Sequence, residues 1–134
     1  MSISPRNLWP EDIDVSEVIA PVTILKEQAS LLGERTKNLV EGRVTPNNDN
    51  FLYTTDFVYD FDLVAPALNN YRYRLFTIEH NVDLYPLFIR NFEAFAVPRL
   101  EVPNEEEFLT RLAEIFSSRK AKSVIKSLIA QSRA

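Results

Sequence analysis

Positions 51 to 64 carry the clearest pattern of hydrophobic and polar residues in the chain, a strict alternation. Aromatic side chains hold most of the odd positions, whereas the even positions are mixed and include Asp56, Asp60 and Asp62. Successive side chains of a strand point to opposite faces. We therefore predict a β-strand with one aromatic face and one acidic, mixed face.

Residues 71–80 alternate in a similar way and predict a second strand. The connection from residue 65 to residue 70 is short, which favours an antiparallel hairpin. If the alternation is unbroken, Tyr71, Tyr73, Leu75 and Thr77 point to one face, and Arg72, Arg74, Phe76, Ile78 and His80 point to the other.

Charge predicts the register of this hairpin. When the two aromatic faces coincide, Asp60 and Asp62 share a face with Arg72 and Arg74. Opposite charges across a pair of strands stabilise a sheet by roughly 0.2–1 kcal/mol per pair. A shift by one residue would place arginine among the tyrosines, so that register is disfavoured.

Two shorter strands are expected after this hairpin. Residues 82–89 predict one of them, and Pro86 places it at an edge or at a bulge because proline cannot donate to a ladder. Residues 92–102 predict a further extended segment around Phe95 and Val97. The residues at 46–50, PNNDN, predict a turn before the first strand.

Helical spacing dominates both ends of the chain. Residues 21–42 predict a long amphipathic helix that Pro21 opens and Gly42 ends. Residues 104–132 predict two helices, with Asn104 as the first N-cap and an interruption near Ser117. Residues 1–20 predict an N-terminal arm, in which the single tryptophan, Trp9, is expected to anchor packing on the body.

These elements predict one domain, residues 1–134, of the α+β class. An antiparallel sheet of three to four strands, residues 51–102, would pack against the long N-terminal helix, with the two C-terminal helices following. Strands that are grouped together, rather than alternating with helices, favour this class over a parallel sheet.

Composition narrows the range of functions. The chain of 134 residues has 46% apolar residues, no cysteine and two glycines. Disulfides, cysteine-ligated metals and glycine-rich phosphate loops are therefore excluded. No apolar run approaches the roughly 20 residues of a membrane span, and no secretory signal is recognisable, so we expect a soluble, cytoplasmic protein. Since no cofactor motif is present, we also expect no cofactor and no identifiable small-molecule site.

The net charge of −4 is unevenly distributed. Residues 1–116 carry all nineteen acidic residues, whereas residues 117–134 carry only cations. The basic residues Arg119, Lys120, Lys122 and Lys126 are a candidate contact surface, and nucleic-acid contact through this helix is one alternative function. Elsewhere two features argue against nucleic-acid binding. The body is acidic, and Tyr71 and Tyr73 are expected on the sheet face opposite to Arg72 and Arg74, so base stacking and phosphate contacts would lie on different sides.

One cluster could support catalysis. Asp56, Asp60 and Asp62 share a strand face, and the expected register brings His80 close to Asp56. Carboxylates with an imidazole suit a divalent metal that activates water, so a metal-dependent hydrolase or nuclease is a second alternative. The core of a restriction-type nuclease would need a further acid near these aspartates on the next strand. Glu79 is the corresponding residue here, and it is expected on the face opposite to the aspartates.

The leading interpretation is a non-catalytic protein-interaction or regulatory module. Nine Phe, five Tyr and one Trp exceed what one helix would cover on a single sheet, so an apolar face would remain for a protein partner or for a homodimer. The acidic body would favour a basic partner. Whether the chain is an enzyme stays open, with a non-enzyme favoured.

Overall fold

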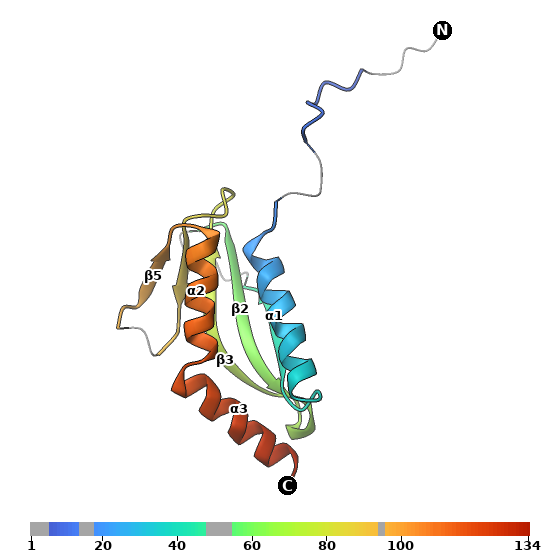
Figure 1. The fold of residues 1–134 in the computed structure, drawn as a ribbon, viewed down its shortest axis with the longest axis vertical. Coiled ribbons are helices and arrows are strands. Elements are labelled where there is room, and N and C mark those ends of the chain that lie inside the picture. The colour runs from blue at the N-terminus through green and yellow to red at the C-terminus, as the bar shows by residue number, and fades with distance from the viewer. Residues whose placement is uncertain (1–5, 14–17, 48–54, 94–95) are drawn as a thin grey trace.

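The computed structural model describes residues 6–13, 18–47, 55–93 and 96–134, and shows helices combined with one antiparallel sheet (Figure 1). The elements follow in the order α1 (Pro21–Arg35), β1 (Glu41–Pro46), β2 (Phe57–Ala65), a short 3-10 turn (Pro66–Leu68), β3 (Tyr71–His80), β4 (Leu87–Arg90), β5 (Arg99–Val102), α2 (Glu105–Phe116) and α3 (Arg119–Ser132). Spatial order equals chain order, β1-β2-β3-β4-β5. The α+β class is therefore confirmed, with five strands instead of the three to four predicted.

The first helix ends earlier than the sequence predicts. α1 stops at Arg35, and Lys37 and Asn38 then adopt left-handed backbone conformations, with φ of 53° and 64°. The Asn38 N–H donates to the Gly33 carbonyl at 2.8 Å and closes the helix end. Burial continues beyond the end of the helix, since even Val40, in the turn before β1, has no exposed surface. The apolar spacing therefore did not mark the end of the helix, and β1 occupies the residues around Gly42.

Later strands are shorter than predicted. β4 begins at Leu87, directly after Pro86, and lies between β3 and β5 with regular pairing on both sides. The expectation of an edge or a bulge is therefore wrong, because the proline precedes the strand. β5 begins at Arg99, and Val97 precedes it. Of the other predicted positions, Phe95, residues 48–50 of the turn and residues 51–54 of the first strand lie outside the described residues.

A bulge in β3 changes which residues share a face. Phe61 pairs with Phe76 but Asp62 pairs with Arg74, so Leu75 is an extra residue on β3. Leu75 and Phe76 are both buried, at 2% and 0% exposure. Two consecutive buried residues cannot fit an unbroken alternation, and the faces predicted for β3 are wrong from Phe76 onward.

Beyond the bulge, Phe76, Ile78 and His80 lie on the same face as Tyr73. Thr77 and Glu79 lie on the same face as Arg74, because Thr77 pairs with Asp60 and Glu79 pairs with Val58. Opposite residues of an antiparallel pair share a face. Glu79 therefore shares the face of Asp60 and Asp62, which contradicts the sequence-based expectation.

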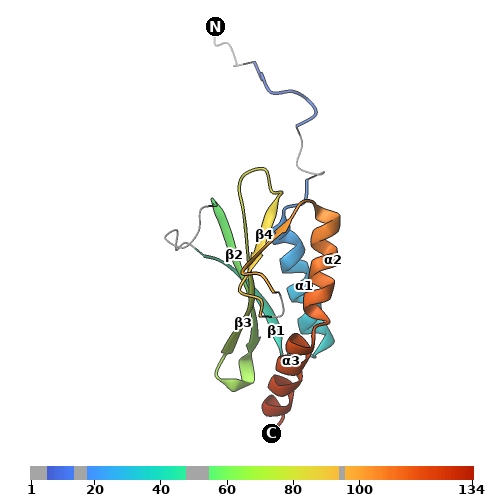
Figure 2. The same cartoon turned by 90° about the vertical axis from the view of Figure 1, so that its left-hand side faces the viewer.

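Helices α1, α2 and α3 lie on one side of the sheet, and the core fills the space between the two layers (Figure 2). The rings of Phe61 and Phe76 stack with centroids 5.1 Å apart, and Phe116 of α2 approaches Phe61 at 5.5 Å. This explains much of the aromatic surplus, since large aromatic side chains fill the helix-covered face of the sheet.

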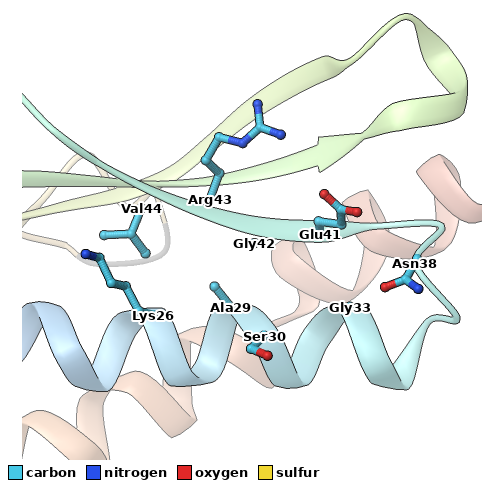
Figure 3. A pocket seen from close by; sticks show the side chains of 9 residues that line it. All are labelled: Lys26, Ala29, Ser30, Gly33, Asn38, Glu41, Gly42, Arg43 and Val44. Atoms are coloured by element: carbon cyan, nitrogen blue, oxygen red, sulfur yellow. The ribbon is translucent and has the colours of Figure 1, made fainter.

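β1 approaches α1 so closely that only glycine fits at position 42. A Cβ atom on Gly42 would lie 2.6 Å from the Cα of Ala29 and 3.0 Å from the ring of Phe61. The side chain of Val44 points towards α1, whereas those of Glu41 and Arg43 point away from it (Figure 3). The exposed edge beside this contact has a shallow hollow of about 400 Å³, whose charged side chains do not converge on a common point.

Both C-terminal helices begin as the sequence predicts. The Asn104 side chain accepts a hydrogen bond of 2.8 Å from the Glu107 N–H, and Ser118 accepts one of 3.1 Å from the Ala121 N–H. These are N-cap contacts, which satisfy amide groups that have no partner within the helix.

The described part of the predicted arm, residues 6–13, lies away from the body (Figure 1). Trp9 is 76% exposed, so the expectation that it anchors packing on its own body is wrong.

Candidate functional site on the open face of the sheet

The face of the sheet turned away from the helices is the candidate site, and we call it the open face (Figure 2). Register assigns it Asp60 and Asp62 of β2 and the residues that pair with them across the sheet. On the described strands these include five arginines and five acids, which are Arg43, Arg72, Arg74, Arg90, Arg99, Glu41, Asp60, Asp62, Glu79 and Glu101. The face is thus strongly charged yet carries no net charge.

The β2–β3 pair brings together the charges that the sequence predicts. Arg74 reaches Oδ1 of Asp62 through Nε at 3.2 Å and Oδ2 of Asp60 through Nη2 at 3.1 Å. Arg72 lies beside Oδ2 of Asp62, with Nη1 3.5 Å away. The expected pairing of these aspartates with these arginines is confirmed.

Glu79 forms a second ionic cluster that the sequence does not predict. Its Oε1 atom accepts from Nε of Arg99 at 2.7 Å, and its Oε2 atom lies 3.0 Å from Nε of Arg90. The guanidinium of Arg99 also lies over the ring of Phe88, 3.5 Å from the ring centre, in a cation–π contact. This cluster ties β3 to β4 and β5.

A chain of hydrogen bonds extends the aspartate cluster towards β4. Thr77 donates from Oγ1 to Oδ1 of Asp60 at 2.7 Å, and Asn91 donates from Nδ2 to the same threonine oxygen at 3.0 Å. Asn91 follows β4 directly and has a left-handed backbone, with φ of 65°. Asparagine tolerates this conformation better than most residues, which aims its side chain at Thr77.

The acids lie beneath the arginines. The side chains of Asp62 and Glu79 have no exposed surface, and that of Asp60 is 6% exposed, whereas the four arginines paired with them are 27–46% exposed. A carboxylate that loses water must be paired with charge or with hydrogen-bond donors. The buried acids therefore hold the guanidinium groups in place, and those groups form the outer surface.

The structure does not assemble the proposed metal site. His80 lies on the helix side, where its ring stacks on Phe57 and Tyr59 at 5.5 and 6.1 Å, and its Nδ1 atom is 2.7 Å from the Asn81 carbonyl oxygen. Asp56 is exposed and precedes β2. His80 is therefore on a different face from Asp60 and Asp62, and Asp56 lies outside the strand that carries them. Within residues 6–13, 18–47, 55–93 and 96–134, no three His, Asp or Glu side chains gather closely enough to hold a metal ion.

The predicted basic surface lies on α3. Arg119, Lys120, Lys122 and Lys126 are all exposed. Spacing of three and four residues aligns Arg119, Lys122 and Lys126 on one helix stripe, while Lys120 projects elsewhere, with Nζ 3.8 Å from Oε2 of Glu93 and 5.8 Å from the ring centre of Tyr73. The stripe and the open face are separate surfaces, because α3 lies on the other side of the sheet (Figure 2).

Comparisons with family models, curated proteins and solved structures found no match. Among the helices in the described part of the chain, none combines the length and the apolar character needed to cross a membrane.

Sequence reasoning missed Glu79, Arg90 and Arg99. One signal in the chain could have indicated Glu79, namely the adjacent apolar pair Leu75 and Phe76, which interrupts alternation and marks a bulge. No local signal assigns Arg90 and Arg99 to Glu79, because both belong to strands whose register depends on long-range pairing.

Proposed function

We propose that this protein is a non-catalytic protein-interaction module and that the open face is its contact surface. The observation that supports this most directly is the layer of exposed guanidinium groups oriented by buried carboxylates. Arginine has five N–H donors in a planar group. Arg99 contacts Glu79 through its Nε donor, a geometry in which the two terminal nitrogens of the guanidinium can serve a partner.

Orientation matters for affinity. A side chain that is already held in its binding conformation loses less entropy on association. Arginine and aromatic residues are also enriched at interface centres, and Phe88 lies beneath the Arg99 guanidinium on this face. The open face therefore favours a partner that offers carboxylates and backbone carbonyls, in place of the basic partner expected from net charge alone.

The balance of charge favours a protein over a nucleic acid. Phosphate backbones are bound mainly through net positive charge, and affinity rises with each uncompensated cation. Asp60, Asp62 and Glu79 compensate the arginines that surround them. Because the acids neutralise the arginine charges, the open face exerts little long-range attraction on a polyanion. Its guanidinium groups can still donate directional hydrogen bonds to a partner.

The same pairing weakens the case for a metal-dependent hydrolase. The oxygens of Asp60 and Asp62 face guanidinium groups, and His80 lies across the sheet from them. We propose a cytoplasmic location as well, on the ground that the chain uses no cysteine.

The test compares two variants with equal loss of positive charge. Arg43→Gln with Arg72→Gln removes two arginines of the open face, and Asp62 keeps Arg74 as a partner. Arg35→Gln with Arg133→Gln is the control, because Arg35 in the last turn of α1 and Arg133 at the C-cap of α3 are both exposed and lie outside the sheet. Each immobilised chain is used to capture proteins from the cells that produce it, and the captured proteins are identified by mass spectrometry.

We expect a partner retained by the native chain and by the control and lost from the open-face variant. Retention of the same proteins by both variants would show that the open face is not the contact. Capture of nothing by the native chain, even after chemical cross-linking in the cells, would remove support for the interaction function itself.

A further inference from the structure

We propose that residues 8–13 of one copy, which we call the arm motif, dock into a groove beside α3 of a second copy. This contact is separate from the open face and does not depend on the function proposed for it. Its support comes from the exposed side chains of the motif, the lining of the groove, the charges of both and their positions in the molecule.

The arm motif exposes large apolar side chains on a locally ordered backbone. Leu8, Trp9 and Ile13 are 86%, 76% and 62% exposed. The Trp9 N–H donates to the Asn7 side chain at 3.0 Å, and the Ile13 N–H donates to the Pro10 carbonyl at 3.3 Å. The second contact closes a turn, so the three apolar side chains are presented with part of the ordering cost already met.

A groove of about 440 Å³ lies between α3 and the β2–β3 hairpin. This volume is within the range of sites that take up a drug-sized ligand. Its lining combines apolar and aromatic side chains with three polar ones, and consists of Leu68, Tyr71, Tyr73, Ser123, Val124, Ser127, Leu128 and Gln131. Tyr71 is 51% exposed at its rim. An indole ring is a suitable occupant, because tryptophan is the residue most enriched at anchoring positions of interfaces.

The charges of the two surfaces are complementary. Glu11 and Asp12 lie within the arm motif, whereas residues 117–134 contain no acid. On α3, Lys120 precedes the groove residue Val124 by one helical turn, and Arg119 and Lys126 are each one turn from Ser123 at the groove wall. A motif seated in the groove would place its acids beside these cations.

The two surfaces lie at opposite ends of the molecule. Residues 6–13 lie beyond the N-terminal end of α1, while α3, which lines the groove, lies at the far end of the body (Figure 1). We therefore assign the arm motif of one copy to the groove of another copy. Such a contact is heterologous, and it produces rings or open chains of subunits according to the rotation between neighbours.

The first experiment uses Trp9, the only tryptophan of the chain, as the reporter. Fluorescence emission and light-scattering mass are measured on the full chain over a range of protein concentrations. We expect the mass to increase with concentration and the emission to move to the blue as the indole leaves water. Trp9→Ala should weaken self-association about tenfold or more. Its control, Val82→Ala, also removes a 73% exposed apolar side chain, and should not weaken assembly.

The second experiment distinguishes docking between copies from docking within one copy. The chain has no cysteine, so a Leu8→Cys variant mixed with a Ser127→Cys variant can form a mixed disulfide only between copies. We expect this covalent dimer to form faster than one between Leu8→Cys and Ala113→Cys, whose exposed cysteine lies on α2.

Three results would overturn the proposal. They are a strictly monomeric native chain with unshifted emission, equal cross-linking rates at positions 127 and 113, and an internal disulfide that forms in a Leu8→Cys/Ser127→Cys chain while the mixed variants remain uncoupled. Because Leu8 and Trp9 are exposed, none of these results would follow merely from misfolding of the variants.

Discussion

The Nε atom of Arg99 donates a 2.7 Å hydrogen bond to Oε1 of Glu79, a carboxylate with no exposed surface at the centre of the sheet. Arg90 approaches the other oxygen of the same carboxylate. Glu79 therefore joins β3 to the two strands that follow it, and it orients one half of the open face. This position makes Glu79 the most informative residue for testing whether the ionic layer stabilises the sheet.

Replacing Glu79 with glutamine is expected to destabilise the protein by about 1.5–3 kcal/mol. The side chain keeps its shape, but two arginines lose a charged acceptor, and hydrogen bonds to charged groups contribute in this range. Urea unfolding followed by circular dichroism measures the effect. Glu101→Gln removes an exposed acid from β5 and is expected to change stability by no more than about 0.5 kcal/mol. Equal losses in the two variants would contradict a role for burial.

The two glycines are expected to respond to alanine in different ways. At Gly42 a new Cβ would lie 2.6 Å from the Cα of Ala29, so α1 and β1 must separate, and we expect a loss of about 1–3 kcal/mol. At Gly33 the Cβ would meet only the flexible side chain of Asn38, at 3.2 Å. Alanine favours a helix over glycine by up to about 1 kcal/mol. Gly33→Ala should therefore be neutral or stabilising, and thermal unfolding of both variants compares them directly.

Tyr85 is expected to make stability depend on pH in the alkaline range. Burial, and to a smaller extent the nearby charge of Glu105, raise the pKa of Tyr85 from 10.0 to about 12. Between these pH values the unfolded chain loses the phenolic proton while the folded chain keeps it. Unfolding is therefore favoured as pH rises through this interval, and the contribution of Tyr85 is fully present below pH 10.

Unfolding midpoints measured across the interval test this expectation. In Tyr85→Phe, the part of the alkaline loss of stability that Tyr85 causes should disappear. At neutral pH this substitution should change stability little, since the Tyr85 hydroxyl is buried without a hydrogen-bond partner among the described residues. Glu105→Gln should lower the pKa of Tyr85 only part of the way, because burial is the larger cause. An unchanged decline in Tyr85→Phe would show that another group is responsible.

Magnesium and manganese are expected not to bind at Asp60 and Asp62. A divalent cation would have to displace the Arg74 guanidinium, which contacts both carboxylates at 3.1 and 3.2 Å. Titration calorimetry should therefore give only heats of dilution with the native chain. A binding heat that is measured with the native chain and lost in Asp60→Ala would support the metal-dependent hydrolase alternative.

Local chemistry predicted the parts of this fold that depend on neighbouring residues. Asn104 begins its helix, as predicted, because its side chain can accept from a backbone N–H three residues ahead. For Ser117 and Ser118 the sequence predicts only an interruption of the helical segment, and the cap that Ser118 provides is seen in the structure. Asp60 and Asp62 face Arg72 and Arg74 because a short connection and opposite charges favour one register of the hairpin. Both predictions needed only side-chain chemistry and the geometry of a short segment.

The sequence by itself therefore determined the α+β class, the central hairpin with its aspartate–arginine pairs, and the beginnings of the last two helices. Only the tertiary structure decided that β1 follows α1 so closely, that the bulge at Leu75 moves Glu79 to the open face, and that Arg90 and Arg99 meet it there. The physical reason is that hydrophobic periodicity records which positions are buried. The backbone conformation that buries them, and the partner strand that lies opposite, are chosen by packing between segments far apart in the chain.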